Sequence, residues 1–174
     1  YLRRAHDFSA DRAASFSAFP LVAMALAVAA GGYLTDSFCR RWGLSRGRKM
    51  CGLFSLPGAI VLVLMAAFWA QGTSAAVLLA LAAGCASLSV ASAWAASVDL
   101  GGSHSGVVSG AMNMFGNLGG ALSPVIFGHC VQQWGATHPW AAWHVPILTT
   151  AACYFLSWVC WILLDVRRSE KCGQ

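Results

Sequence analysis

The distribution of charged residues along the chain constrains its fold more than any other feature. Between Lys49 and Asp165 the only Asp, Glu, Lys or Arg is Asp99, so residues 50–98 and 100–164 form two long uncharged runs. A helix needs about 20 apolar residues to cross the hydrocarbon core of a bilayer, so each run is long enough for at least two crossings. The sequence therefore predicts an all-α integral membrane protein.

Composition excludes most soluble classes of protein. The chain has 174 residues, of which 58% are hydrophobic and 10% charged, whereas a soluble domain has about 25% charged residues. The net charge of +5 comes mainly from two basic clusters beside apolar segments, which indicates membrane topology rather than nucleic-acid binding. The seven cysteines are scattered without a C-x-x-C pair, so we expect them to pack as small apolar residues. No metal or other cofactor is expected.

Polar residues divide the apolar sequence into five predicted spans joined by short connections. The chain begins with Tyr1 rather than Met, and Tyr1-Leu2 is typical of the end of a helix, so we expect a fragment that lacks a sixth span before residue 1. The predicted spans lie at about 13–35, 50–70, 75–98, 106–131 and 144–164. A basic loop at 37–49 follows the first span, and a basic tail at 165–174 follows the last.

The basic residues also predict an orientation. The loop at 37–49 and the tail carry most of the Lys and Arg residues, whereas the opposite side has Arg3, Arg4 and Arg12. We therefore expect a multi-pass protein of the cell (inner) membrane. The positive-inside rule places its basic loop and C-terminus in the cytoplasm. An aromatic belt is expected at the outer interface, formed by Trp69, Trp134, Trp140 and Trp143.

The fourth predicted span carries a polar stripe. Ser109, Asn113, Asn117 and Gly120 are spaced 4, 4 and 3 residues apart, which places them on one helix face. Carboxamides are costly in lipid unless they face protein or a water-filled cavity. They either contact a small polar solute or hydrogen-bond to another helix, and the sequence leaves both interpretations open. Ser92, in the preceding span, is a further candidate for the same cavity, although serine is also common in packed membrane helices.

Glycines in the same region predict close helix packing. They form two sets, at 102–110 and at 116–120, and within each set they repeat every four residues. Small residues at this spacing allow two helix backbones to approach each other. We expect packing rather than ligand contact at Gly102, Gly106, Gly110, Gly116 and Gly120.

The segment that links the first two predicted spans contains a specific charged pattern. It begins with Gly32, Leu34 and Asp36 and ends with a cationic run into the second span. A carboxylate here gains from a neighbouring cation and from the N-terminus of the incoming helix. The pattern resembles the G-x-L-x-D-R-x-G-R-[RK] loop motif of the major facilitator superfamily. It departs from that motif at Ser37, where the family has Arg, and in an insert before Arg48.

A second stretch strengthens the resemblance. Residues 94–106 and the string N-x-x-G-N-x-G-G-x-x-S-P at 113–124 are similar to helices ten and eleven of the anion:cation symporter branch, which includes hexuronate, glucarate and galactonate carriers. The resemblance implies the C-terminal six-helix half of a 12-helix fold, with five complete spans present. The N-terminal half of the same protein and the lipid bilayer are the implied partners.

The resemblance also implies a function: secondary transport of small organic anions, such as sugar acids or related carboxylates, by alternating access. Coupling to protons is expected, with sodium as the other candidate ion. In this branch a buried Arg of the N-terminal half binds the substrate carboxylate, and the present chain would supply polar residues of the cavity wall, namely Asn113, Asn117, Ser109 and Ser92. The basic loop would act as a conformational latch formed by Gly32, Asp36, Arg40, Arg41 and Arg48.

Three other interpretations stay open at this point. A facilitator of another branch, such as a sugar or drug carrier, would share the fold and the latch. An intramembrane serine hydrolase could use Ser109 with His104, His129 or His144, but the predicted topology places His104 and His144 at opposite membrane faces. A structural membrane subunit without a transport path would not need the polar stripe.

Overall fold

The computed structural model describes the chain as a bundle of long helices. It covers residues 10–70, 72–135 and 137–164, with the side chains of 10–17 and 139 left out. Tyr1-Leu2, Arg3, Arg4 and the tail at 165–174 therefore lie outside the described residues. The elements are α2 (Ala10–Trp42), α3 (Leu44–Phe68), α4 (Thr73–Gly101), the short 3₁₀ helix η1 (Gly102–His104), α5 (Ser105–Trp134) and α6 (Pro139–Leu163).

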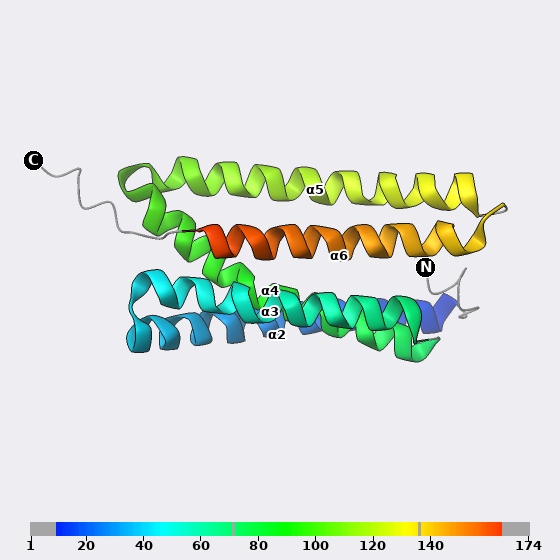
Figure 1. Cartoon of the computed structure of the whole chain (residues 1–174), viewed down its shortest axis with the longest axis horizontal. Coiled ribbons are helices and arrows are strands. Elements are labelled where there is room, and N and C mark those ends of the chain that lie inside the picture. Colours follow the sequence, from blue (N-terminus) through cyan, green and yellow to red (C-terminus); the bar gives the residue numbers. More distant parts are fainter. Residues whose placement is uncertain (1–9, 71, 136, 165–174) are drawn as a thin grey trace, which may run out of the picture.

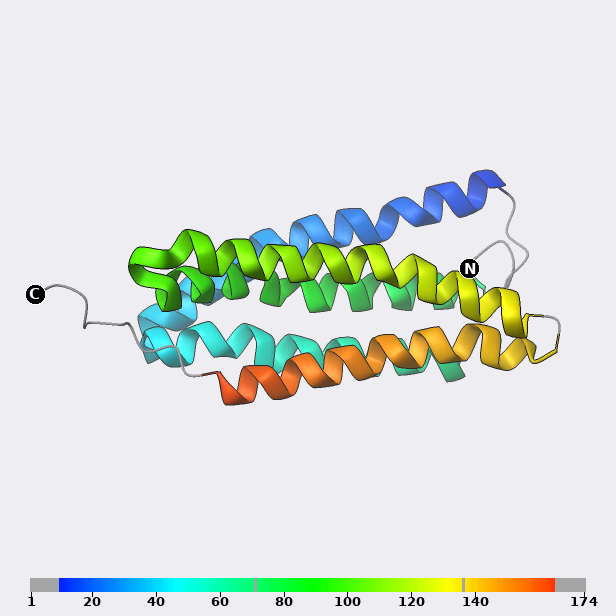
Figure 2. The same ribbon diagram turned by 90° about the horizontal axis from the view of Figure 1, so that it is seen from above.

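Consecutive helices run in opposite directions along the bundle (Figures 1 and 2). The end at which α2 and α4 finish and α3 and α5 begin is called the basic end here, because it contains Arg40, Arg41, Arg46, Arg48 and Lys49. The other end, where α3 and α5 finish, is called the opposite end. α4 packs most extensively against α2 and α3, α6 packs on α3, and α5 lies along α4 and α6 at the edge of the bundle.

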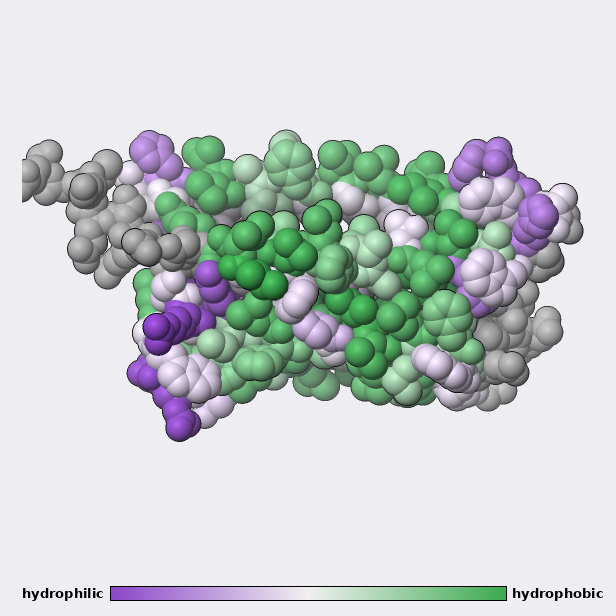
Figure 3. All heavy atoms as spheres, in the orientation of Figure 1, coloured by the Kyte–Doolittle hydropathy of each residue, from purple (hydrophilic) through white to green (hydrophobic). Residues whose placement is uncertain are grey.

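The surface is apolar along the length of the bundle. Figure 3 shows hydrophobic residues across its middle and hydrophilic residues gathered towards its two ends. Large apolar side chains are widely exposed, among them Leu21, Phe54 and Val107, which are about 70% accessible. A soluble monomer rarely exposes apolar patches beyond a few hundred Å², whereas a bilayer covers such a surface. The chain is therefore a multi-pass α-helical membrane protein.

By length and hydropathy, four segments among the described residues can cross a membrane. They are Ala18–Trp42, Leu44–Phe68, Thr73–Trp134 and Trp140–Leu163. The third segment has 62 residues and contains α4, η1 and α5, which fold back on each other at the basic end. A single straight helix of that length would extend about 90 Å, roughly three times the hydrocarbon thickness. Five separate spans, with α4 and α5 crossing once each, stay a prediction.

The predicted loops are shorter than expected. The basic loop at 37–49 is wrong as a loop, because α2 continues to Trp42 and α3 begins at Leu44, leaving only Gly43 with a positive φ of 83° between them. The sequence between the predicted spans at 99–105 and 132–143, which was expected to connect them, is also largely helical among the described residues. Charged residues mark the edge of the hydrocarbon, whereas a helix continues beyond it as long as its backbone hydrogen bonds are satisfied.

Small residues set the spacing of the inner helices. A Cβ at Gly31 would overlap the backbone carbonyl of Leu88, so α2 and α4 are in direct backbone contact there. At Gly52 it would overlap the ring of Trp161, which brings α6 onto α3. Close approach of backbones at small residues is the usual packing mode of helices in membranes, where apolar burial gives little driving force.

Candidate functional site

The basic end is organised around the guanidinium group of Arg48. This side chain is 15% exposed and contacts carboxylates from two other helices. Its Nε donates to Asp99 Oδ2 of α4 at 2.8 Å, and its Nη1 lies 3.7 Å from Asp36 Oδ1 of α2. The Asp99 side chain is 21% exposed and the Asp36 side chain 66%. Arg48 therefore joins three helices, with a short charge-assisted hydrogen bond to Asp99 and a longer, more screened contact to Asp36.

Ser92 holds the backbone beneath this cluster. Its hydroxyl group donates to the carbonyl oxygen of Arg48, and the residue has no exposed surface. The prediction that Ser92 lines a substrate cavity disagrees with this placement, because its face of α4 points into the contact with α3. Serine hydroxyl groups often join packed membrane helices in this way.

The glycines near the latch differ in how tightly they are packed. A Cβ at Gly32, the glycine of the sequence motif, would lie 3.7 Å from the Cβ of Ala91, which is ordinary van der Waals contact. Its neighbour Gly31 has no such space. Gly47 lies directly against the backbone of Cys39, where α2 and α3 meet at the basic end.

Arg40 and Arg41 lie apart from the carboxylates. Both are exposed, and neither forms an ion pair with any described residue. The guanidinium of Arg41 lies 5.7 Å from the centroid of the Trp42 ring, within the range of a cation–π contact. Of the basic residues in the predicted latch, only Arg48 contacts Asp36 among the described residues.

Asp99 is the member of this cluster that the sequence pattern of the latch does not include. It follows the third predicted span, where a connection is expected, but α4 continues past it to Gly101. A signal was present, because Asp99 is the only Asp, Glu, Lys or Arg between residues 49 and 165, and ionisable residues within membrane segments normally have a partner.

The polar stripe lies on α5, where Asn113 and Asn117 are exposed and Ser109 is half-buried. Asn117 Nδ2 donates to the backbone carbonyl of Asn113 at 2.9 Å. This bond occupies one of the two N–H donors of Asn117 and leaves the side-chain amide of Asn113 available. At Asn113 and Asn117 the stripe therefore presents several N–H groups on a part of α5 that no other described helix covers.

Ser109 joins α5 to α4 through a hydroxyl pair. Its Oγ is 2.9 Å from Oγ of Ser97, and Ser97 in turn donates to the carbonyl oxygen of Trp94 at 2.7 Å. Because a carbonyl only accepts, the single hydroxyl hydrogen of Ser97 is used there and Ser109 must be the donor of the pair. Ser109 can then offer only acceptor lone pairs to a third group.

The glycines of α5 do not pack against this chain. A Cβ at Gly106, Gly110, Gly116 or Gly120 would meet no atom within 4 Å, and Gly102 is likewise open. Cys130 is the only buried residue among the described side chains of α5. The predicted close packing is therefore wrong within the described residues, because α5 lies at the edge of the bundle.

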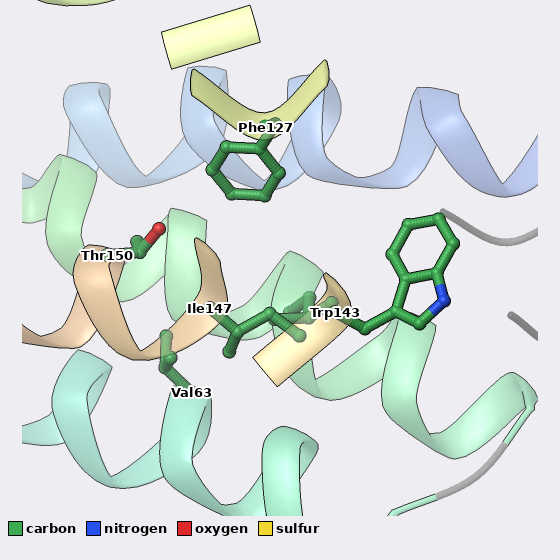
Figure 4. Close-up of a pocket in the computed structure, with 6 residues that line it drawn as sticks. Val63, Phe127, Trp143, Ile147 and Thr150 are labelled. Carbon is green, nitrogen blue, oxygen red and sulfur yellow. The ribbon is translucent and has the colours of Figure 1, made fainter. Parts of the chain in front are cut away.

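A separate cavity of about 220 Å³ lies towards the opposite end, between α3, α4, α5 and α6 (Figure 4). Its only polar side chain apart from the Trp143 indole is Thr150, whose hydroxyl donates to the carbonyl oxygen of Pro146 at 3.1 Å. Such walls suit an apolar group rather than an anion. The lining residues are Val63, Leu79, Phe127, Trp143, Ile147 and Thr150, so the cavity does not include the polar stripe.

Other site chemistry finds little support in the part of the chain that the structure describes. No group of three or more His, Cys, Asp or Glu is placed to hold a metal ion there. The six described cysteines are free thiols. Cys51 contacts the hydroxyl group of Thr35, and Cys85 donates to the carbonyl oxygen of Ser55. Ser109 bonds to Ser97 rather than to a histidine, which gives no support to the hydrolase alternative.

Fold and site together define a helical membrane protein with a charged cluster at one end and a polar stripe on an edge helix. The sequence matches the model of the Major Facilitator Superfamily over residues 1–173, and the chain belongs to that superfamily. It is similar to the protein named "Probable sulfoacetate transporter SauU" of Cupriavidus necator, with 31% identity over 137 residues. That alignment covers 78% of this chain and 32% of the relative, so the chain spans about a third of the relative's length. No solved structure matches the chain.

The name of this relative describes it as a transporter.

Proposed function

We propose that this chain forms the substrate-facing wall of a secondary transporter for small organic anions. The observation that carries the proposal is the exposed stripe on α5, where Asn113 and Asn117 present amide N–H groups within an otherwise apolar segment. An uncompensated carboxamide is costly in lipid, so this face needs a polar partner. The organic anion in the name of the similar protein is a partner of suitable chemistry.

The donors on the stripe suit a carboxylate or sulfonate group. Asn113 has two N–H groups and Asn117 retains one, and hydrogen bonds from such donors to an anion are shorter and stronger than neutral pairs. Ser109 contributes an acceptor, which suits a hydroxyl group of the substrate. Ser92 supports the latch instead of the wall. Sugar acids and related carboxylates combine both kinds of group.

The remaining parts of the proposal follow the anion:cation symporter branch. The chain would be the C-terminal half, with spans eight to twelve, and α5 would face the N-terminal half across the transport path. That half would supply the cation that neutralises the substrate. Transport would be coupled to protons, or to sodium as the alternative, and would proceed by rocking of the two halves. The basic end would face the cytoplasm, in accordance with the positive-inside rule.

The Arg48 cluster is proposed as the latch of this transporter. Asp99 holds Arg48 within the chain by the shorter contact, and the exposed Asp36 is free to exchange partners as the two halves move. Arg40 and Arg41 are exposed at the same end and would contact the other half or lipid headgroups.

Uptake by the whole transporter in proteoliposomes tests the proposal, with sulfoacetate and a set of sugar acids as substrates. Loss of one hydrogen bond to a charged group costs about 1.5–3 kcal/mol, so Asn113→Ala is expected to raise KM roughly 10- to 100-fold. Asn117→Ala should raise it less, because one of its N–H groups is already bonded within the helix.

Gln133→Ala provides a matched control. Gln133 is an exposed carboxamide on the same helix, twenty residues from Asn113 and on another face at 100° per residue, so its loss should leave KM unchanged. Unchanged KM in all three variants would remove the stripe from substrate binding. Uptake of neutral sugars or drugs instead of anions would favour a carrier of another branch.

A further inference from the structure

The apolar cavity of about 220 Å³ lies at the depth of one lipid leaflet. Val63 is five residues before the end of α3 at Phe68, and Thr150 is eleven residues after the start of α6 at Pro139. At a rise of about 1.5 Å per residue, these walls lie about 7–17 Å from the opposite end of the bundle. Since each leaflet contributes about 15 Å of hydrocarbon, this is the depth of the acyl chains of the leaflet at that end.

The cavity has a buried floor and an open mouth. Val63 and Ile147 are 2% and 6% exposed and belong to the apolar core formed by α3, α4 and α6. Phe127 of the edge helix α5 lies across the cavity from them (Figure 4). Because the lining side chains other than Val63 and Ile147 are half-buried, the cavity opens at the surface of the bundle. Ile126, next to Phe127, is 48% exposed, so this surface is apolar near the opening as well.

Water does not suit these walls. The volume would take about seven water molecules at roughly 30 Å³ each, and a buried water makes about three hydrogen bonds. The polar groups among the lining side chains are the indole N–H of Trp143 and the hydroxyl group of Thr150, whose hydrogen is donated to the carbonyl oxygen of Pro146. One donor and one acceptor cannot satisfy such a group of waters, and they do not neutralise an anion.

Hydrocarbon suits the walls in both size and chemistry. An apolar cavity of about 150 Å³ binds benzene, so the larger volume here accommodates roughly eight or nine carbon atoms. Side chains that face a void lose dispersion contacts, and methylene groups at van der Waals distance restore them. The bilayer supplies such groups at high concentration and at the same depth, so no polar anchor is needed to bring them to the opening.

We propose that this cavity binds a segment of one phospholipid acyl chain from the leaflet at the opposite end. The chain packs against Val63 of α3 on one side and Phe127 of α5 on the other. Since α5 packs mainly on α4 and α6, the bound chain adds a contact between the edge helix and α3. The site depends on the apolar walls alone and holds whatever substrate the protein transports.

Photolabelling of the whole transporter in phosphatidylcholine nanodiscs tests the proposal without any substitution. The probe is a phosphatidylcholine with a photoreactive diazirine in the middle of one acyl chain, and the labelled residues are identified by mass spectrometry of peptides. Label is expected on Ile147 as well as on Phe155, which is 55% exposed on the same helix. Because Ile147 is 6% exposed, its label comes from a chain within the cavity. Label on Phe155 with none on the lining residues overturns the proposal.

Two adjacent threonines provide a matched pair of variants. Thr150→Phe places a ring in the cavity, whereas Thr149→Phe places the same ring at an exposed position outside it. Each substitution also removes one hydroxyl bond to a carbonyl four residues earlier, so this loss is common to both. A close-packed interior has no room for a ring and a chain together, so the label on Ile147 should fall roughly tenfold in Thr150→Phe and stay unchanged in Thr149→Phe.

Equal labelling of Ile147 in these two variants would refute the cavity as the binding site. If Thr150→Phe does not fold, Leu79→Phe fills the cavity from α4 and carries the same expectation. Loss of anion uptake in any of these variants bears only on the proposed function, because the label reports the bound lipid and not transport.

Discussion

Alanine at Gly31 is expected to push α2 away from α4, whereas alanine at the adjacent Gly32 is expected to be tolerated. A Cβ at Gly31 would overlap the carbonyl oxygen of Leu88 and lie only 2.9 Å from its carbon and 3.0 Å from its Cα. At Gly32 the nearest atom would be the Cβ of Ala91 at 3.7 Å. The first obstacle is helix backbone, which cannot rotate aside as a side chain does.

The expected magnitude follows from these distances. Non-bonded carbon atoms pack at about 3.5–4.0 Å, so Gly31→Ala requires the helices to separate by roughly 0.5–1 Å. Overpacking of this kind costs about 1–3 kcal/mol. Both substitutions gain a similar helix propensity, up to about 1 kcal/mol, which cancels when the two variants are compared. Gly31→Ala should therefore be less stable than Gly32→Ala by about 1–3 kcal/mol.

Equilibrium unfolding of the two variants in the same detergent measures this difference. The wild-type protein supplies the reference, and Gly32→Ala should unfold at the same denaturant concentration or a higher one. Equal midpoints for the two variants would refute the reasoning, because they would show that α2 and α4 are not in backbone contact at Gly31. A lower midpoint for Gly32→Ala would instead favour the motif glycine as the close contact.

Two further substitutions test the contacts of α3. Asp99→Asn is expected to destabilise the protein by more than Asp36→Asn, because the first contact to the guanidinium is 2.8 Å and partly buried and the second is 3.7 Å and exposed. Thermal unfolding at low and high salt checks this order, and equal effects would contradict it. Trp158→Phe removes the indole N–H that donates to the carbonyl of Leu53 at 3.2 Å, so we expect a loss of about 1 kcal/mol by chemical unfolding, and no loss would show that the bond is not formed.

The sequence predicted the helical class of the fold because lipid allows few alternatives. Each predicted span overlaps one observed helix, although the spans at 50–70 and 144–164 extend one or two residues beyond it. An apolar run in a bilayer has to satisfy its own backbone hydrogen bonds. The positions of the charged residues did not predict the ends of the helices, because the segments 37–42 and 44–49 contain the basic residues and are nevertheless helical. Arg and Lys are good helix formers, so a cationic run outside the hydrocarbon does not end a helix.

The site was predicted less completely than the fold. The latch pattern placed Asp36 beside Arg40, Arg41 or the N-terminus of the incoming helix, whereas the cation that contacts it is Arg48 in the first turns of that helix. Which arginine faces the carboxylate depends on helix direction, which spacing in sequence does not give. Asp99 is 51 residues from Arg48, and their contact needs the packing of α4 on α3. Likewise Gly32 fits the motif, while the buried contact is made by Gly31, because only the crossing point of α2 and α4 decides which glycine faces inward.

The geometry of the Arg48 cluster bears on how the proposed latch would work. A latch that releases has to contain one contact that persists and one that exchanges. The hydrogen bond to Asp99 is short and shielded, and Ser92 fixes the backbone of the same residue, so α3 and α4 stay joined at the basic end. Asp36 is 66% exposed and 3.7 Å away, so its attraction to Arg48 is screened by water and readily replaced. The motion is therefore expected to break the contact of α2 with Arg48 and to leave that of α4 intact.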